Sequence, residues 1–461
     1  MNCAVVSAPV GTASVGERAK ALGAYYTPDP AVAFMIRWAI RDADYRVIDP
    51  SFGNGQFLRA SVTNSEVKLK NPSEQIYGVE LDAETFNANR GILESQYKIF
   101  KLSNDDFFES DHFFEREFQK TSPFKVFEAV VGNPPFIRYQ RFKSRERTKA
   151  LARALEHGVK LPGHASSWAP FLIHAVSLIK PGGRLAMVVP AELSHAAYAQ
   201  NVLGHLLDKF ASLTILTFQK RLFPALGEDT FILLGDGLCD VVGRRFGDLS
   251  LVDVESQDHL SAYEGDFASL GNVRIFEPQD LRAIRQRKAK LLEYLLKDEV
   301  HRLYKTVRSA AGPTQKIKSF GQVVKVGIGY VTGDNAFFHP SAETIAQFGL
   351  ASHLLPCIRR SGSLRGLAIT QADWDRDPEP NKRLLTISSD EPLSALPVGV
   401  RTYLEQGEEQ GILRRFKVRS RNPWYAVSPI KRGDAFLSYM SNGAPRLVHN
   451  PLGLPAPNTL H

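Results

Sequence analysis

The feature that most constrains the fold is a regular alternation of short apolar runs and helical segments between residues 45 and 189. The runs are four to six residues long, as buried strands are, and the segments between them carry apolar residues at helical spacing. The runs lie at 45–48, 76–80, 98–102, 127–131 and 184–189. One helical segment begins at Gln56, a second spans Asp82–Leu93 and a third spans Trp168–Ile179. This alternation predicts an α/β fold, an open sheet wound with helices on both faces.

The alternation of strand and helix signals is lost near residue 240. Beyond it come an Arg- and Lys-rich helical segment at 281–296 and Gly-punctuated strand candidates at 322–326 and 328–332. A chain of 461 residues is long enough for two or three domains of ~150 residues. We therefore expect a flexible lead-in at 1–22, an α/β domain at 23–240 and a mixed α+β domain at 241–461.

Composition narrows the class of protein. Apolar residues make up 43% and charged residues 23%, which is ordinary for a globular protein and excludes overall disorder. No apolar run reaches the ~18 residues of a membrane helix, and the first residues do not resemble a secretory signal. Three widely spaced cysteines argue against a disulfide scaffold and suit a reducing cytoplasm. The net charge of +8 indicates a polyanionic partner, although a merely basic soluble protein has the same balance.

Three acidic residues follow successive predicted strands. Asp49 opens a glycine-bearing turn, Asp49–Gly55, that lacks the lysine of a phosphate-binding loop and favours a cationic ligand group. Glu80 ends the next strand, where a carboxylate accepts bonds from ribose hydroxyls in nucleotide-binding folds. Asp106 follows the third strand and suits the exocyclic amine of an adenine ring, with Phe107 beside it. Each signal has a plain alternative, namely a turn, a solvated strand end or a helix cap.

The sharpest signal is the sequence Asn-Pro-Pro-Phe at 133–136, directly after a buried strand. The two prolines fix the backbone and remove two N–H donors, so the Asn133 side-chain oxygen and the Pro134 carbonyl form a rigid pair of acceptors. Phe136 supplies a flat apolar wall beside them. This arrangement suits a planar amine that is held by both N–H bonds and stacked on a ring.

With these motifs in this order, the chain resembles the gamma class (Taq-like) of adenine-N6 DNA methyltransferases from restriction–modification systems. The segment Gly23–Pro28 resembles the family's first motif, beside the methionine end of S-adenosylmethionine, and Asp49–Gly55 resembles its cofactor loop. The resemblance covers roughly residues 23–240 and implies a Rossmann-like catalytic domain followed by a DNA-recognition domain. It implies these cofactor-binding residues: Tyr26, Thr27, Asp49, Ser51, Phe52, Gly53, Gly55, Glu80, Leu81, Asp106, Phe107 and Phe171. It implies these catalytic residues: Asn133, Pro134, Pro135 and Phe136.

The resemblance also predicts partners. Double-stranded DNA is the expected substrate, a separate restriction endonuclease acting on the same site is a further expected partner, and the chain is expected to be a cytoplasmic monomer that needs no metal. Basic and aromatic residues alternate at 401–432, which suits phosphate and base contacts. From this segment we expect DNA contacts by Arg414, Arg415, Arg421 and Trp424. Relatives sandwich the target base with a second aromatic, for which Phe231 is the candidate.

Two other functions remain open from the sequence. Asn-Pro-Pro-aromatic sites also occur in RNA and protein-glutamine methyltransferases, and a catalytically silent DNA-binding or specificity subunit could keep the same fold. The basic segment after residue 240 favours DNA as the substrate over RNA or a protein glutamine. The intact Asn133–Phe136 tetrapeptide and the glycine turn argue against a catalytically silent subunit.

Overall fold

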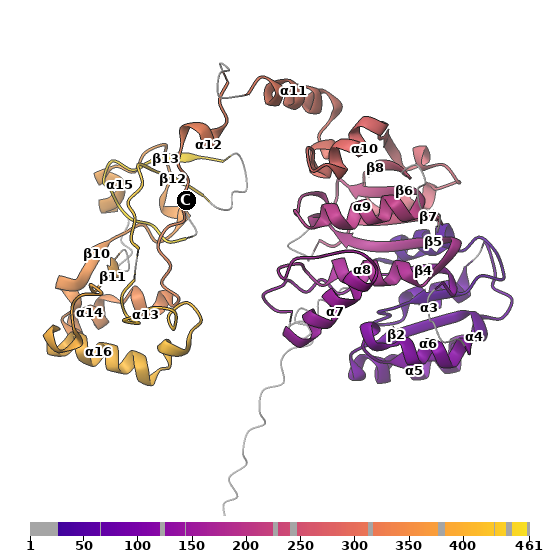
Figure 1. The fold of residues 1–461 in the computed structure, drawn as a ribbon, viewed down its shortest axis with the longest axis horizontal. Coiled ribbons are helices and arrows are strands. Elements are labelled where there is room, and N and C mark those ends of the chain that lie inside the picture. Colours follow the sequence, from indigo (N-terminus) through magenta and orange to yellow (C-terminus); the bar gives the residue numbers. More distant parts are fainter. Residues whose placement is uncertain are drawn as a thin grey trace, which may run out of the picture. The chain divides into compact units, whose positions relative to one another are not determined.

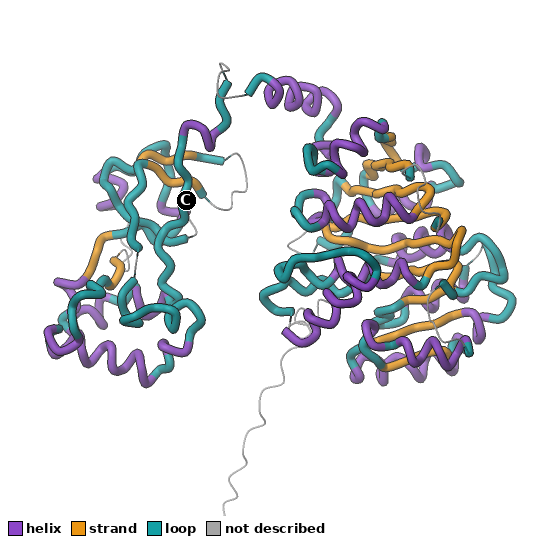
Figure 2. The backbone as a smooth tube through the Cα atoms, viewed as in Figure 1, coloured by secondary structure: helices purple, strands orange, loops and turns teal. Residues whose placement is uncertain are grey.

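The structure is a computed structural model that describes residues 26–64, 66–119, 125–142, 144–224, 229–239, 247–311, 317–376, 383–427, 429–438 and 445–458. The expected lead-in at 1–22 and the first three residues of the Gly23–Pro28 motif lie outside these ranges. The chain divides into two compact units, which meet between Tyr304 and Lys305. Figures 1 and 2 show both units, the first built around a large sheet and the second mostly of loops and short helices.

The first unit is built on one nine-stranded sheet in the order β3-β2-β1-β4-β5-β7-β6-β8-β9. The strands from β3 to β5 are parallel, whereas β7 runs antiparallel to both of its neighbours. The order reverses between β1 and β4, which is where open α/β sheets bind ligands. The strands are β1 Val47–Asp49, β2 Ile76–Glu80, β3 Lys101–Asn104, β4 Phe127–Gly132, β5 Ile179–Pro190, β6 Phe210–Phe218, β7 Thr230–Leu238, β8 Asp248–Val254 and β9 Gly271–Ile275.

Helices cover both faces of this sheet and bury a separate apolar core on each. One core joins α2, α3 and α5 to one set of strand residues, and the other joins α6, α8, α9 and α10 to the alternating set. The helices are α2 Asp29–Ala39, α3 Gln56–Thr63, α4 Pro72–Gln75, α5 Ala83–Tyr97, α6 Asp111–Phe118, α7 Ser144–Glu156, α8 Trp168–Ser177, α9 Ala199–Lys209, α10 Pro278–Arg285 and α11 Asp298–Ser309. The expected Rossmann-like fold, a sheet with helices on both faces, is confirmed.

The predicted strands and helices of this unit are present, with shifted ends. The strand expected at 98–102 begins only at Lys101, because Lys98 takes a left-handed conformation (φ 57°) that caps α5. The helix expected to reach Ile179 ends at Ser177, and Ile179 already belongs to β5. The segment at 281–296 is not one helix: α10 ends at Arg285, and a short 3-10 helix follows at Leu291–Leu295.

The division between the units differs from the boundary expected near residue 240. Two further strands, β8 and β9, extend the sheet beyond β6, and α10 packs on the same core as α9. Residues 248–285 therefore belong to the first unit, and the second unit begins at Lys305. The loss of clear alternation after residue 240 reflects strands at the edge of the sheet, which carry more polar residues than central strands.

The second unit has little regular sheet. Its two antiparallel pairs, β10 with β11 and β12 with β13, are built from strands of three residues each. Its apolar core gathers around Tyr330, Phe338, Val400 and Leu404. Its elements are α12 Phe320–Val323, α13 Asn335–Phe338, α14 Ala342–Phe348, β10 Leu354–Pro356, α15 Gln371–Arg376, β11 Arg383–Leu385, α16 Val398–Glu409, β12 Ala435–Leu437 and β13 Leu447–His449.

The strands expected at 322–326 and 328–332 are absent from the described structure. Phe320–Val323 is a short helix, and the only pairing of the stretch that follows is one isolated bridge from Tyr330 to Pro457. Val323 and Ile328 are each 62% exposed, so the apolar pattern there is not paired with a neighbouring strand.

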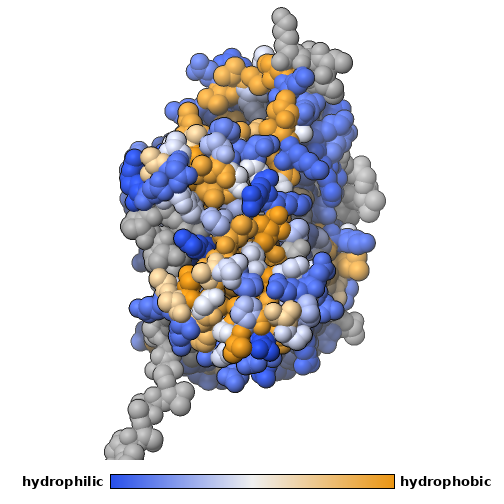
Figure 3. Space-filling model, turned by 90° about the vertical axis from the view of Figure 1, so that its left-hand side faces the viewer, coloured by the Kyte–Doolittle hydropathy of each residue, from blue (hydrophilic) through white to orange (hydrophobic). Residues whose placement is uncertain are grey.

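Figure 3 shows hydrophobic residues in small patches between hydrophilic ones across one face of the molecule. Within the described residues, no helix combines the length and the apolar character that crossing a bilayer requires.

Candidate active site

The predicted site residues gather where the sheet order reverses. Asp49 is the last residue of β1, Glu80 is the last residue of β2, and Asn133 follows β4 directly. These three strands are neighbours in the sheet and parallel, so their carboxyl ends lie along one edge. The motifs that are far apart in sequence therefore meet at one place.

Asp49 and Gly132 show how closely these motifs are packed. Asp49 is 1% exposed, and its carboxylate accepts the N–H of Ser51 at 3.0 Å. A Cβ on Gly132 would lie 2.7 Å from the same Asp49 oxygen, and Gly132 has a φ of 152°. Only glycine fits this contact, so the residue before Asn133 is fixed by the cofactor turn of β1.

The turn after Asp49 needs its glycines for backbone conformation. Gly53 and Gly55 have φ values of 53° and 76°, a region that side-chain-bearing residues avoid. Gly55 begins α3, and Leu93 of α5 packs against it. The ring of Tyr26, which is itself 62% exposed, lies 3.8 Å from the Cβ position of Gly53. The described end of the first motif and the glycine turn therefore lie side by side, and both stay open to a ligand.

Glu80 connects the turn to the second strand. Its two carboxylate oxygens accept the backbone N–H groups of Gly53 at 2.9 Å and Asp82 at 2.8 Å. Asn104 in turn donates to the backbone carbonyl of Glu80 at 2.7 Å. Leu81, the next residue, is 59% exposed at the same edge. Glu80 is therefore held by protein N–H groups on one side and adjoins an exposed apolar side chain on the other.

The tetrapeptide is tied to the cofactor turn and to α8. The Ser51 hydroxyl donates to the backbone carbonyl of Asn133 at 3.2 Å. Ser167, just before α8, donates its hydroxyl to the Pro135 carbonyl, accepts the Ile137 N–H at 2.8 Å and donates its own N–H to the Ile137 carbonyl at 3.0 Å. Ser167 was not among the predicted residues, because nothing in the sequence links it to a segment thirty residues earlier.

Phe136 and its prolines have different exposures. Pro134 is buried, whereas Pro135 and Phe136 are half-buried. Phe136 packs against both apolar cores of the sheet while keeping part of its surface open. A half-buried ring held from two sides can offer a flat face to a stacked base. Phe231, the candidate for a second wall, is 5% exposed and pairs with Val189 inside the sheet, so that prediction is wrong.

Asp106 sits in a loop that α7 and α8 support. Its carboxylate accepts the Phe108 N–H at 3.1 Å, so it also serves as the helix cap that the sequence left open. Phe107 and Phe171 are only 4% and 3% exposed, and their rings lie 4.7 Å apart. These two rings therefore back the loop from inside the core and do not line an open surface.

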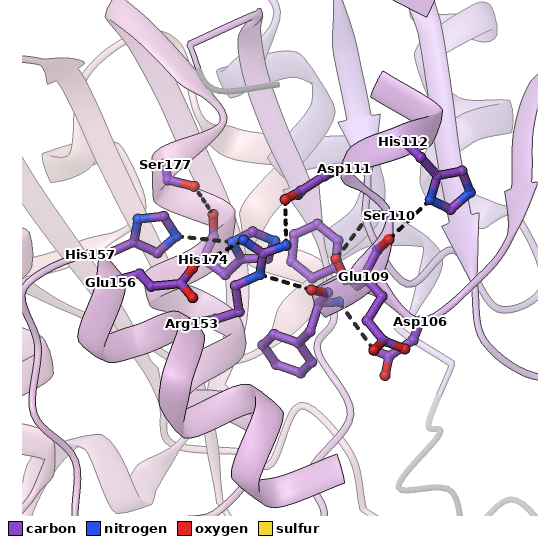
Figure 4. A network of polar contacts seen from close by, with 12 residues as sticks. Asp106, Glu109, Ser110, Asp111, His112, Arg153, Glu156, His157, His174 and Ser177 are labelled. Atoms are coloured by element: carbon purple, nitrogen blue, oxygen red, sulfur yellow. Dashed lines mark hydrogen bonds and ion pairs between the residues drawn. The ribbon is translucent and has the colours of Figure 1, made fainter. Parts of the chain in front are cut away.

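Arg153 supports this loop, as Figure 4 shows. Arg153 on α7 donates to the Phe108 carbonyl at 2.8 Å and pairs with Asp111. His157 and His174 lie beside it with ring nitrogens 3.1 Å apart. Burial lowers the pKa of His174 to about 3, so both rings are neutral contacts at neutral pH. The sequence reasoning missed Arg153, because its role depends on the packing of α7.

The site is rich in carboxylates and poor in partners for them. Burial, with Glu80 nearby, raises the pKa of Asp49 to about 8, although the Ser51 N–H opposes the shift. Burial also raises the pKa of Glu80 and of Asp106. Within the described ranges, neither Asp49 nor Glu80 forms an ion pair with a Lys or Arg. A positively charged ligand would stabilise their ionised forms.

Thr27 adds a second feature that fits a ligand site. Its hydroxyl is buried, with no hydrogen-bond partner among the described residues, and Thr27 itself is 3% exposed. Buried polar groups are normally paired, so an unpaired hydroxyl next to Tyr26 and the glycine turn is consistent with a ligand contact. An acid-lined site with close-approach glycines fits S-adenosylmethionine, which carries a sulfonium and an ammonium. Within the described residues, no group of three or more His, Cys, Asp or Glu is arranged to hold a metal ion.

The four residues expected to contact DNA lie in the second unit and differ in exposure. Arg414 and Arg415 are exposed, and Arg415 pairs with the buried Asp334 at 2.8 Å. Arg421 donates to the Val331 carbonyl and is half-buried. Trp424 is 9% exposed and donates to Glu408 at 2.9 Å, inside the core of the unit. Trp424 is therefore a core residue and not a surface platform for a base, and Arg421 is largely occupied by the protein.

Two protein-family models match the chain. The N-6 DNA Methylase model matches residues 13–236, and the model of the C-terminal domain of Type II methyltransferase M.Eco57I matches residues 288–461. Together they cover most of the chain and agree with the order of motifs at the sheet edge. Residues 13–236, just under half of the chain, thus match the N-6 DNA methylase family. The cofactor is S-adenosylmethionine, and the two matches, with a Type II methyltransferase among the relatives, show a methyltransferase of the restriction–modification type.

Individual relatives are distant. The chain is 22% identical over 441 residues to Type II methyltransferase M.AccI of Acinetobacter calcoaceticus, which covers 94% of this chain and 74% of that one. It is 27% identical over 208 residues to Type II methyltransferase M.XamI of Xanthomonas campestris pv. amaranthicola, covering 44% and 36%. The chain thus spans about three quarters of the first relative and about a third of the second.

One solved structure supports the fold. A cryo-EM structure of a DrdV–DNA complex matches with a TM-score of 0.50 at 13% identity, over 74% of this chain and 38% of that one. At this identity the likeness shows the fold alone. It agrees with the Rossmann-like sheet described above.

Proposed function

We propose that this chain is a site-specific DNA methyltransferase that transfers a methyl group from S-adenosylmethionine to the N6 amine of an adenine flipped out of duplex DNA. In this proposal it is the modification half of a restriction–modification system in a bacterial or archaeal cytoplasm. The observation that carries the proposal is the bond from the Ser51 hydroxyl to the Asn133 carbonyl at 3.2 Å. It joins the cofactor turn to the tetrapeptide, so donor and acceptor of the methyl group meet at one sheet edge.

The chemistry follows from the residues at that edge. S-adenosylmethionine supplies a methyl group on a sulfonium, which is already a strong electrophile. The adenine amine is a poor nucleophile, because its lone pair is delocalised into the ring. The Asn133 side-chain oxygen and the Pro134 carbonyl accept both amine hydrogens and localise that lone pair without a strong base. Once the nitrogen carries the methyl group, it loses one of these two hydrogens to solvent as a proton. Catalysis is then mostly positioning and preorganised electrostatics.

The target base also needs a place outside the duplex. Extruding it costs a few kcal/mol of stacking and pairing. Stacking on the half-buried Phe136 ring would offset part of this cost, on the order of 1–3 kcal/mol. Tyr26, Thr27, the Asp49–Gly55 turn and Glu80 would hold the cofactor, with Asp106 at the edge of its adenine. Phe107 and Phe171 would support that pocket from the core. The family match does not favour the RNA or protein-glutamine alternatives.

A sequencing experiment tests the proposal. The chain is expressed in a host without adenine methylation, beside the Asn133→Ala variant, and host DNA is sequenced for N6-methyladenine. We expect methyladenine at one short sequence with the wild-type chain and almost none with the variant. Folded wild-type chain that binds S-adenosylmethionine but leaves the host DNA unmodified would overturn the proposal.

A further inference from the structure

A strongly basic segment follows the tetrapeptide directly, and only its last cation, Arg153, has so far been given a role. Between residues 138 and 153 there is a single acidic residue, Glu146. The basic residues of this segment are Arg138, Arg141, Lys143, Arg145, Arg147, Lys149 and Arg153. Such a density of positive charge on a short segment is typical of a surface that meets a polyanion.

The start of the segment is held firmly beside the site. Ile137 is fixed by its two backbone bonds with Ser167. The Arg138 carbonyl accepts the N–H groups of Arg141 at 2.9 Å and of Phe142 at 3.0 Å, which closes a turn. Phe142 is 7% exposed and anchors this turn in the protein. The cations of the turn are therefore carried on an ordered piece of backbone.

Two of the cations serve the protein itself. Lys149 pairs with Glu109 at 2.5 Å and lies 3.9 Å from Asp106. Arg153 pairs with Asp111, as Figure 4 shows. These contacts hold α7 against the loop that carries the proposed adenine-edge residue. Arg147 is half-buried and donates to the Tyr139 carbonyl at 3.3 Å.

The outward cations are Arg138, Arg141 and Arg145, all of which are exposed. Within the described ranges, Arg141 and Arg145 form no ion pair with an acidic side chain. Arg138 is five residues after Asn133, so their Cα atoms are at most roughly 17 Å apart. Arg141 and Arg145 thus add exposed positive charge to the turn and helix that directly follow Arg138.

We propose that Arg138, Arg141 and Arg145 form a phosphate-binding surface on the first unit that holds the DNA strand carrying the target base. This inference rests on the proposed function. A flipped nucleotide rotates about its backbone, so its flanking phosphates stay outside while the base enters the site. Cations on the rim of the site are placed to meet those phosphates. Such contacts position the DNA but do not read its sequence.

The test compares three forms of the full chain: wild type, Arg141→Gln/Arg145→Gln and the matched control Lys68→Gln/Arg282→Gln. Lys68 and Arg282 are exposed cations of the same unit, outside the elements that carry site residues. Binding to a short DNA duplex is measured by fluorescence anisotropy at several salt concentrations. S-adenosylmethionine affinity and thermal stability are measured in parallel.

We expect the magnitude of the log–log salt slope to fall by about 1.8 in Arg141→Gln/Arg145→Gln, since each phosphate contact contributes about 0.9. At 0.1 M salt this corresponds to roughly sixtyfold weaker binding, equal for all DNA sequences. Cofactor affinity should not change, and the control pair should keep the wild-type slope.

Two results would overturn the inference while leaving the proposed function intact. One is a wild-type slope in Arg141→Gln/Arg145→Gln, and the other is an equal loss in the control pair, which would show only a general charge effect. The failure of the proposed function looks different, because the wild-type chain then methylates no DNA at all, and the inference fails with it.

Discussion

The two units of this protein solve different problems with different kinds of structure. The first places its chemistry at the ends of strands inside a nine-stranded sheet, where Asp49 is 1% exposed and Gly132 has no room for a side chain. The second has strands of only three residues and carries its cations on loops and short helices. A rigid sheet edge suits a reaction that depends on exact positions of acceptors. Loops on a small core suit contacts that differ from one relative to the next.

The contrast also appears in electrostatics. Buried carboxylates with raised pKa values gather in the first unit around Asp49, Glu80 and Asp106. In the second unit, Arg414 and Arg415 are exposed and face solvent. The first pattern fits a small cationic ligand and the second fits a large anionic one. The basic segment at 138–153 is the exception, because Arg138, Arg141 and Arg145 are exposed cations on the first unit, which holds the buried carboxylates.

The largest expected effect comes from separating the units. A fragment ending after Ser309 should bind S-adenosylmethionine but lose its preference for one DNA sequence, a loss of about a thousandfold or more in discrimination. A fragment ending at residue 240 should be much less stable, because it removes β8 and β9 and exposes the edge of β6. Calorimetry and binding to matched and scrambled duplexes measure both. If either fragment methylated the same site as fast as the full chain, the second unit would not be needed to recognise DNA.

The second effect concerns catalysis. Asn133→Ala should slow methyl transfer by about two to three orders of magnitude, in line with losing one preorganised group at a reacting centre. Affinity for DNA and for the cofactor should change little. Single-turnover kinetics measure the rate, with Asn87→Ala on an exposed part of α5 as a matched control. A near wild-type rate in Asn133→Ala would remove that residue from the reaction.

The third effect concerns cofactor binding. Glu80→Ala should weaken S-adenosylmethionine by about 1.5–3 kcal/mol for each lost charge-assisted bond, or roughly ten- to a hundredfold. Because Glu80 also accepts the Gly53 and Asp82 N–H groups, Glu80→Gln serves as the milder variant that keeps one acceptor. Calorimetry gives the affinity, and a melting curve reports on the fold. Unchanged affinity in both variants would contradict the prediction that Glu80 accepts hydrogen bonds from the ribose hydroxyls of the cofactor.

The fourth effect is a dependence on pH. The pKa of Asp49 is about 8 in the folded chain and 3.8 in the unfolded chain, so the fold without ligand holds an extra proton between these values. Its stability should therefore fall as pH rises through this window, up to about pH 8. A cationic ligand favours ionised Asp49, so affinity for S-adenosylmethionine should rise from pH 6 to 7.5, by at most tenfold per pH unit.

Calorimetry in two buffers of different ionisation enthalpy measures the proton released on binding. Asp49→Asn should abolish both the release and the pH dependence of affinity. If the wild-type chain releases no proton at pH 6.5, ligand binding does not ionise Asp49 and the explanation is incorrect.

The smallest effect separates two neighbouring arginines of the second unit. Arg415→Gln removes the charged partner of the buried Asp334, which keeps its bond from the Phe337 N–H, and should lower stability by about 1–2 kcal/mol. Arg414→Gln should leave stability unchanged and weaken DNA binding slightly. Chemical denaturation and DNA titrations distinguish the two. Equal behaviour of both variants in both measurements would show that the ion pair gives Arg415 no separate role.

Much of the first unit could be predicted because its signals are local. The strands at 76–80 and 127–131 are short, apolar and followed by turn residues, and both are present in the sheet. The boundary could not be read in the same way. Strands β8 and β9 carry polar residues at the edge of the sheet, so their pattern resembles that of a loop-rich domain. In the second unit, the residues at 322–332 have an apolar pattern but no neighbouring strand to pair with, so they do not form a strand.

The order of Asp49, Glu80, Asp106 and Asn133, each at or just after the end of a strand, was enough to predict a turn that binds the cofactor and a pair of amine acceptors. These features are local, since a strand end and a rigid turn are written in a few adjacent residues. Only the tertiary structure decided which distant residues support them. Ser167 holds the tetrapeptide and Arg153 holds the Asp106 loop. It also placed Trp424 in a core, because burial depends on packing between segments that no short pattern describes.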